Sequence, residues 1–302
     1  MIVPLALNVL ALGASYALVA LGFVLILNAT GAVNFAQGDL VMLGGFVAVV
    51  LASHLPLPPL LLLPLLLAAM GAIGVLIAVG AYFPLRDRPA EAVFISTIAV
   101  GIILQNAANL LFGPEPQAAP ALFGAGAWRW GGMFIDRQSL AVIGVAGLLI
   151  SALYGVFGYT PLGWRLRAVA QDREMTALLG VPVDRMIAAT FAVGAALAGA
   201  AGMLLANTFF VTPTEGANYI LKAYIAVVVG GWGSLPGAVA GALLIALFEV
   251  LYPSLPVVIP SLAHADALFS QNVSTIVLDV VVLLILLLRP QGLFGEASRA
   301  RP

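Results

Sequence analysis

The chain has 302 residues, of which 63% are hydrophobic and 8% are charged, and its formal net charge at pH 7 is −1. Soluble domains carry about 25% charged residues, whereas here apolar runs of about 17 residues or more, long enough to cross a hydrocarbon layer of roughly 30 Å, recur from end to end. The composition therefore excludes a soluble protein, predicts an integral membrane protein, and offers no basic patch to hold nucleic acid.

Apolar segments bounded by proline, glycine and charged residues predict eight or nine membrane spans. The count depends on whether the two segments between 219 and 252 both cross the membrane. In chain order the segments are 5–27, 35–53, 58–82, 91–112, 138–157, 187–207, 219–232, 236–252 and 273–288. The first is too long for a signal peptide and lacks its basic residues, so we expect a retained helix. Leucine and alanine dominate without strict alternation, which predicts an all-α polytopic bundle, one domain over 1–302, and not a β-barrel.

Arginines gather in three regions that the nine-span order places on one side of the membrane. These are Arg86 and Arg88, then Arg165, Arg167, Arg173 and Arg185, and finally Arg289, Arg299 and Arg301. Cytoplasmic loops carry an excess of basic residues, so we expect this side to be cytoplasmic, the N-terminus to be external and the C-terminus to be cytoplasmic. Residues 158–186 then form a long cytoplasmic loop and residues 113–137 the longest external loop.

Polar residues interrupt the chain between the first two apolar segments, in NATGAVNFAQGD at 28–39. The candidates for a substrate path are Asn34, Gln37 and Asp39, because glycines and amides together permit a non-helical break of the kind that lines transport pathways. In bulk solvent the same residues would form only an inter-helix turn. We expect Asp39 about one turn into its span from the cytoplasmic side, where it either stabilises a helix N-terminus or lines the path.

Other polar residues lie within later spans. Gln105 and Asn106, in the fourth segment, are candidates for inter-helix hydrogen bonds or for substrate contact. Lys222 and Glu249 are expected near the external ends of consecutive spans, where an ion pair would be structural rather than gating. Asp279 lies in the last span, and the sequence names no partner for it.

The loop TPLGWRLRAVAQDREMTALLGVPVDR, residues 160–185, has the signals of a built helix. Thr160 is a suitable cap, Pro161 suits the first helical position, and the helix is expected to run from Leu162 to about Leu179. Gly180 then supplies a left-handed residue that ends it. One side is apolar and the other charged, which fits either a docked partner or a helix lying in the lipid interface.

Small residues recur four apart in two series, which lets helices approach closely in lipid. The candidate packing residues are Gly194, Ala198 and Gly202, and then Gly233, Gly237 and Gly241. Pro236 interrupts the second series, so residues 230–237 are expected to form a tight hairpin or a broken helix.

The chain resembles the permeases of the branched-chain amino acid ABC importers, to which urea and amide permeases are closely related. Four stretches in order carry the resemblance: NFAQGDLVMLG (34–44), RLRAVAQDREMTALLG (165–180), FAVGAALAGAAG (191–202) and LKAYIAVVVGGWGSLPGA (221–238). The resemblance implies a bacterial inner-membrane permease that pairs with a second homologous permease, two cytoplasmic ATP-binding subunits and an extracytoplasmic solute-binding protein. The implied ATPase-coupling residues are Arg165, Arg167, Asp172, Glu174, Ala177 and Gly180.

The sequence adds support for a separate motor. A Walker A loop needs the pattern G-x-x-x-x-G-K-[ST], and Lys222, within LKAY, is the chain's only lysine. ATP would therefore be used by partner subunits, and no cofactor is expected on this chain, which has no cysteine and only two histidines. The alternative is an ion-gradient-driven secondary transporter of a small polar solute, with Asp39, Glu249 or Asp279 as coupling carboxylates.

Overall fold

A computed structural model describes residues 2–124, 126–130, 133–259, 268–289 and 291–293. The helices are α1 Ile2–Thr30, α2 Gln37–His54, α3 Pro59–Ile77, α4 Ala90–Phe112, α5 Arg137–Tyr159, α6 Pro161–Gln171, α7 Arg173–Leu178, α8 Val183–Leu205, α9 Gly216–Gly230, α10 Leu235–Val258 and α11 Gln271–Leu288. In this part of the chain, 8 helices are long and apolar enough to cross a membrane, and α9 is a shorter apolar helix. The predicted polytopic all-α bundle is confirmed.

Two features depart from plain helices. The third span is continued beyond α3 by a π-helical turn, η1 Ala78–Tyr82, and a 3-10 turn, η2 Phe83–Leu85. In the predicted external loop, β1 Ala127–Trp130 and β2 Met133–Asp136 pair as a small antiparallel sheet. Asp136 then caps α5, because its carboxylate accepts a hydrogen bond from the backbone N–H of Ser139.

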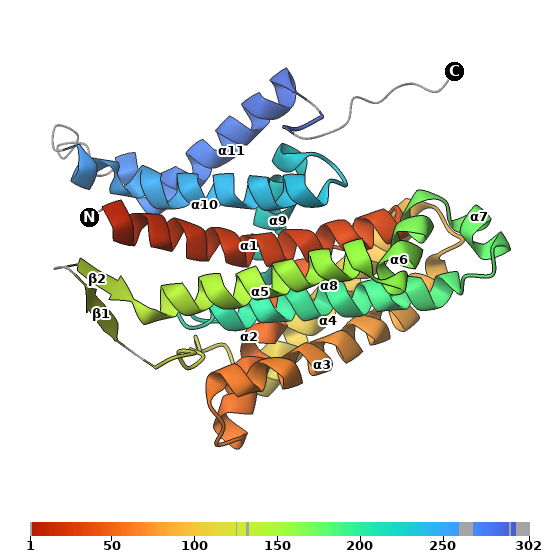
Figure 1. The fold of residues 1–302 in the computed structure, drawn as a ribbon, viewed down its shortest axis with the longest axis horizontal. Helices are drawn as coiled ribbons and strands as arrows, with labels where there is room; N and C mark the ends of the chain where they lie inside the picture. The colour runs from red at the N-terminus through yellow and green to blue at the C-terminus, as the bar shows by residue number, and fades with distance from the viewer. Residues whose placement is uncertain (1, 125, 131–132, 260–267, 290, 294–302) are drawn as a thin grey trace.

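Helices α1 and α8 form the centre of the bundle (Figure 1). α1 packs on α10, α8, α5 and α9, while α8 packs on α2 and α3 as well. Within its most apolar window α1 is 83% buried, against 22% for α4 and 17% for α11. A helix that is apolar all round is expected in such a central position, and α1 is such a helix.

Glycines allow the central helices to approach backbone to backbone. A Cβ on Gly202 would overlap the carbonyl oxygen of Val41 in α2, and Gly194 faces Gly22 of α1. Ala198, one turn between the two glycines of α8, is fully buried. These contacts fix how closely α8 lies against α1 and α2.

The second glycine series divides between two elements. Gly237 and Gly241 lie in α10, where a Cβ on either would overlap backbone atoms of α9. Gly233 does not pack helices: it lies in the turn between α9 and α10 with a positive φ of 78°. Asn28 Nδ2 donates to its carbonyl oxygen at 2.8 Å. Gly233 is therefore part of the predicted hairpin and is not one of the glycines that pack α10 against α9.

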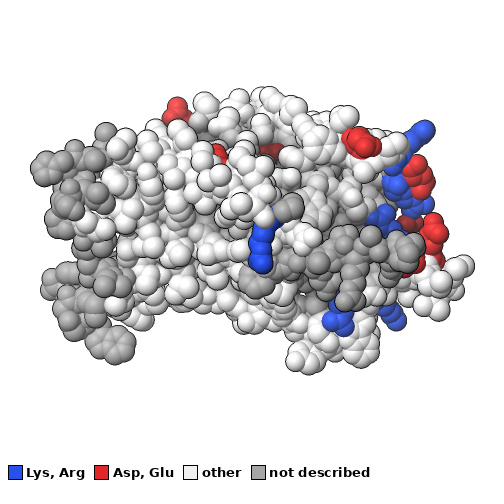
Figure 2. Space-filling view, turned by 90° about the horizontal axis from the view of Figure 1, so that it is seen from above, with Lys and Arg blue, Asp and Glu red and all other residues white. Residues whose placement is uncertain are grey.

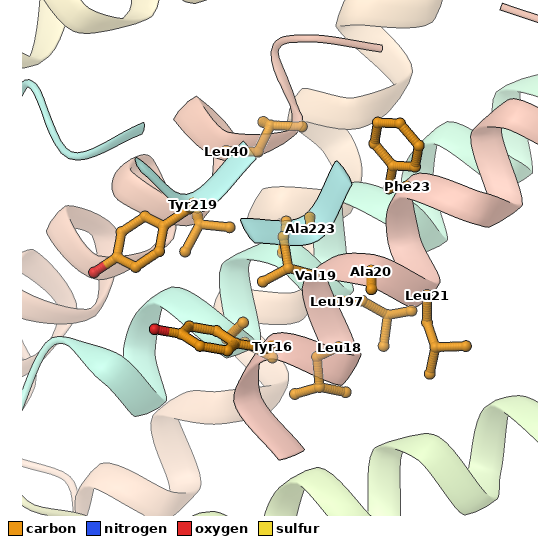
Figure 3. Packing of buried hydrophobic residues seen from close by; sticks show 14 of the residues in the cluster. Tyr16, Leu18, Val19, Ala20, Leu21, Phe23, Leu40, Leu197, Tyr219 and Ala223 are labelled. Atoms are coloured by element: carbon orange, nitrogen blue, oxygen red, sulfur yellow. The ribbon is translucent and has the colours of Figure 1, made fainter. Parts of the chain in front are cut away.

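Helices α2 and α9 both begin inside the bundle. After α1 ends at Thr30, residues 31–36 are non-helical, and Gln37 then lies beside Gly22 of α1 and Gly194 of α8. Gly22 is eight residues before the end of α1, which is about 12 Å along the helix axis at 1.5 Å per residue. α9 begins at Gly216, which contacts Asp39 of α2. Leu40 of α2, Ala223 of α9 and Leu197 of α8 all belong to the buried hydrophobic cluster of which Figure 3 shows a part.

Candidate functional site

The first turn of α2 brings Asp39 against the first residue of α9. The Asp39 carboxylate lies between Gly216 and Gly101, and Gln105 Nε2 donates to its Oδ1 at 2.8 Å. Gly101 is halfway along α4. Asp39 is therefore deep in the bundle and 6% exposed, and its expected position near the cytoplasmic edge is wrong. Hydropathy located the start of the apolar run, but it carried no information that residues 31–36 re-enter the bundle before α2 begins.

The chain between α1 and α2 shows the predicted non-helical break, and side chains satisfy its backbone. Thr30 Oγ1 accepts from the N–H of Ala32 at 3.2 Å, and Asn34 Oδ1 accepts from the N–H of Ala36 at 3.2 Å. Thr97 Oγ1 on α4 accepts from the N–H of Phe35 at 3.1 Å. Backbone at membrane depth needs such partners. Thr97 was missed, although an isolated threonine in an apolar span is a signal of this kind.

Two amide atoms at this break have no hydrogen-bond partner within the described residues. They are Nδ2 of Asn34 and Oε1 of Gln37, and these residues are 2% and 0% exposed. Gln37 uses its other amide atom, Nε2, to donate to the carbonyl oxygen of Gly194 at 3.0 Å. An unpaired buried polar atom costs about 1–3 kcal/mol. The site therefore holds unused hydrogen-bonding capacity beside Asp39.

Not every predicted path residue joins this site. Gln105 reaches Asp39, but Asn106 is exposed and donates to the carbonyl oxygen of Ile102 in its own helix at 2.7 Å. Neighbouring residues on a helix point about 100° apart, so only one of the two can face Asp39. Asp279 is also exposed, on α11.

A second polar cluster joins α1, α9 and α10. Lys222 Nζ donates to Glu249 Oε1 at 2.6 Å and to the Tyr16 hydroxyl at 2.7 Å, and that hydroxyl donates to Glu249 Oε2 at 3.0 Å. The predicted ion pair is confirmed, but its expected place near the external helix ends is wrong, since Tyr16 is at the middle of α1. Tyr16 was missed; a lone tyrosine inside an otherwise apolar span was the available signal.

The predicted cytoplasmic helix is two helices. Thr160 accepts from the N–H of Gly163 and Pro161 begins α6, as expected. Asp172 then has an extended backbone, and its Oδ1 accepts from the N–H of Met175 at 2.9 Å, which caps α7. The single-helix prediction is therefore wrong, because an aspartate followed by helix formers is itself a start signal. Gly180 has the expected positive φ, 79°.

The two short helices differ in what they expose. Leu166 and Val169 of α6 are buried, whereas Met175, Leu178 and Leu179 at α7 are 56%, 82% and 77% exposed. The six predicted coupling residues are all exposed, namely Arg165, Arg167, Asp172, Glu174, Ala177 and Gly180. Together with Met175, Leu178 and Leu179, these six residues form what we call the α6–α7 surface.

A hydrogen bond ties α7 to the third span, and an ion pair ties the start of α8 to the loop that follows this span. Arg173 Nη1 donates to the Tyr82 hydroxyl at 3.1 Å, and Arg86 Nη1 donates to Asp184 Oδ1 at 2.6 Å. The Asp184 carboxylate raises the pKa of the Arg86 guanidinium. Figure 2 shows most of the visible charged side chains gathered at one end, and Figure 1 places α6 and α7 opposite the N-terminus. Arg299 and Arg301 lie outside the described residues.

Comparison with known proteins agrees with this architecture. A family model described as "Branched-chain amino acid transport system / permease component" matches residues 5–288. The chain is 34% identical to the high-affinity branched-chain amino acid transport system permease protein LivH of Salmonella typhimurium, covering 96% of this chain and 94% of LivH. It is 32% identical to the corresponding protein BraD of Pseudomonas aeruginosa, with the same coverage.

Among solved structures, the chain is similar to PsaBC from Streptococcus pneumoniae in complex with Fab, with a TM-score of 0.50. The alignment covers 94% of this chain and 91% of that chain at 14% identity, so this likeness concerns the fold alone. The family model and the two relatives each span nearly the entire chain, from the first helix to the last. The chain therefore belongs to the permease components of the branched-chain amino acid transport system.

Proposed function

We propose that the chain is one of two homologous permease subunits of an ABC importer in a bacterial inner membrane. Two separate ATP-binding subunits would dock at the end that carries α6 and α7, which would then be cytoplasmic, and an extracytoplasmic protein would deliver the substrate. The names of LivH and BraD support a branched-chain amino acid as that substrate. Family membership favours this function over an ion-gradient-driven transporter.

The α6–α7 surface is the observation that carries the proposal. A helix lying in the lipid interface would turn its apolar side to the membrane, but α6 already buries Leu166 and Val169 in the bundle. At α7, exposed Leu178 and Leu179 instead stand beside charged residues of both signs. Apolar patches rimmed by polar residues mark protein interaction sites, so we infer that an ATP-binding subunit covers this surface.

Contacts link the surface to the centre of the bundle. α6 packs on α5, α1 and α8, and α7 contacts α8. Gln37 contacts α1 at Gly22 and α8 at Gly194. A displacement of the α6–α7 segment that moves α1 and α8 would therefore also change the surroundings of the start of α2. Packed helices shear or rotate as bodies rather than deform continuously. ATP-driven closure of the partner subunits would in this way open or close the path.

The start of α2 is the proposed substrate path. Asp39 and Gln105 supply a carboxylate and an amide there, and Asn34 and Gln37 each have a buried amide atom that no described residue pairs with. Discontinuous helices with polar backbone at mid-depth are typical of transport sites. A small solute crossing the bundle at this point would find hydrogen-bond partners in an otherwise apolar interior.

The test is transport by the complete complex in proteoliposomes. We expect uptake of leucine that requires internal ATP and the external binding protein and that persists when proton and sodium gradients are collapsed. Glu174→Arg should abolish substrate-stimulated ATP hydrolysis and uptake while the chain remains inserted; Glu91→Arg, an exposed charge reversal on α4, is the matched control. Uptake by the isolated chain on an ion gradient would refute the proposal, and normal coupling in Glu174→Arg would refute the docking assignment.

A further inference from the structure

A cleft of about 710 Å³ lies between α1, α9, α10 and α11, and its described lining contains no residue of α2. Its charged lining is Lys222, Glu249 and Glu215. An apolar wall is contributed by Leu12, Val250, Pro253 and Val257. The cleft therefore joins a charged region to an apolar surface within one cavity. In Figure 3 the Tyr16 and Tyr219 hydroxyls, which also belong to this lining, point to the same side.

The charged groups of this cleft are at mid-depth in the bundle. Tyr16, which bonds both members of the ion pair, is the middle residue of α1. The Lys222 and Glu249 side chains are 24% and 12% exposed in the isolated chain, and they face the cleft. Charged groups are costly against lipid at this depth. The cleft must therefore contain water or be covered by protein, as at a boundary with a second permease.

The charges fit a zwitterion better than an anion or a neutral solute. One cation and two carboxylates give the lining a formal charge of −1. An ammonium group has three N–H donors, and Lys222 uses two of them on Tyr16 and Glu249. Within the described residues the third has no acceptor, so it can bind a substrate carboxylate without breaking the existing ion pair.

The second carboxylate is available to a substrate amine. Glu215 accepts from Asn218 Nδ2 at 3.0 Å, and among the described residues it forms no ion pair. Glu215, Asn218 and Lys222 follow the spacing i, i+3, i+7, which places them along one side of α9. Glu215 and Lys222 are about 10 Å apart along the axis, and both have long side chains that can reach toward a solute between them.

We propose that this cleft binds the transported amino acid as a zwitterion, with Lys222 holding its carboxylate, Glu215 its ammonium group and the apolar wall its branched side chain. The inference rests on the proposed transport function and adds a binding site for its substrate. A carboxylate without an amine would meet the excess negative charge unopposed. An amine without a carboxylate would leave the third Lys222 donor unused.

The absence of cysteine from the chain allows a clean test by labelling. In the purified complex, Ser254→Cys introduces a near-isosteric thiol in the cleft lining, and Ser53→Cys places one at the exposed end of α2. A charged, membrane-impermeant methanethiosulfonate should label both. Leucine should slow labelling at 254 only, whereas 4-methylpentanoate and 3-methylbutylamine, each lacking one charged group, should not slow it at the same concentration.

Glu215→Gln then tests the ammonium ligand. Loss of a charge-assisted hydrogen bond should raise the leucine concentration for half-protection by about tenfold or more. Glu91→Gln, an exposed acid on α4, should leave it unchanged. Three results would each overturn the inference. These are no labelling at 254, protection by 4-methylpentanoate equal to that by leucine, and unchanged protection by leucine in Glu215→Gln. Wild-type uptake separates the two proposals: if ATP-dependent leucine uptake persists in any of these cases, the transport function stands and only the binding site is wrong.

Discussion

The Lys222–Glu249 pair gives a prediction about stability that can be worked from the structure. Lys222→Met removes the cation and leaves the Glu249 carboxylate at mid-depth without a counter-ion. Breaking a buried pair costs about 3–5 kcal/mol. Here Tyr16 still donates to Glu249 at 3.0 Å and Gln271 at 3.3 Å, and the two paired side chains keep 24% and 12% exposure. We therefore expect Lys222→Met to lower the free energy of unfolding by about 3 kcal/mol, the lower end of this range.

A double-mutant cycle isolates the pair from the effects of each single change. Glu249→Leu alone should also destabilise, because it leaves the ammonium group without its partner. The double variant Lys222→Met/Glu249→Leu buries no charge, so its loss should be smaller than the sum of the single losses by about 1–3 kcal/mol. Gln271→Leu, which removes only the weakest of the three donors, serves as the control.

The assay is equilibrium unfolding of the purified protein in mixed micelles, followed by the loss of helical circular dichroism. Protein and partner concentrations must be held fixed, because partners that bind the folded state shift its apparent stability. Strictly additive losses in the cycle would refute the reasoning. They would mean that the 2.6 Å contact between Lys222 Nζ and Glu249 Oε1 does not couple the two residues energetically.

Further predictions concern the packing, the path and the coupling segment. Gly202→Ala should destabilise by about 1–3 kcal/mol, because the added Cβ would overlap the Val41 carbonyl. Gly144→Ala in α5, whose added Cβ would meet nothing within 4 Å, should be neutral or stabilising in the same unfolding assay. Asp39→Asn keeps the shape but not the charge, and should lower leucine uptake by about tenfold with ATP hydrolysis retained; normal uptake with a lowered Tm would instead support a structural role. Asp172→Ala should cost about 1 kcal/mol as a lost cap and reduce the uptake per ATP hydrolysed, whereas Asp172→Asn should retain both, and equal behaviour of the two variants would contradict the capping role.

Much of the fold could be predicted because its signals are local. Span positions follow from the length of apolar runs, and the observed helices match them within a few residues at most ends. Thr160 and Gly180 act as start and stop signals where the sequence places them. The break at Asp172 is equally local, since its own side chain caps the next helix, and an aspartate followed by helix formers is a start signal in the sequence.

Depth within the bundle could not be predicted in this way. Asp39 follows a short polar stretch in the sequence, which fits a loop at the membrane edge as well as a re-entrant segment. Only packing distinguishes the two, because Gly101 and Gly216, from distant parts of the chain, supply the space around its carboxylate. The same holds for Asn106, since hydropathy does not tell which side of α4 faces the interior.

The sequence by itself determined an all-α membrane protein, its spans, its arginine-rich regions and the motifs of a permease family. These depend on hydrophobic length, on caps and on residue order, which are written along the chain. The tertiary structure alone decided that α2 and α9 begin against each other inside the bundle, and that Tyr16, Lys222 and Glu249 form one cluster. Tyr16 is 206 residues from Lys222 and 233 from Glu249, and such contacts exist only once packed helices fix where each side chain lies.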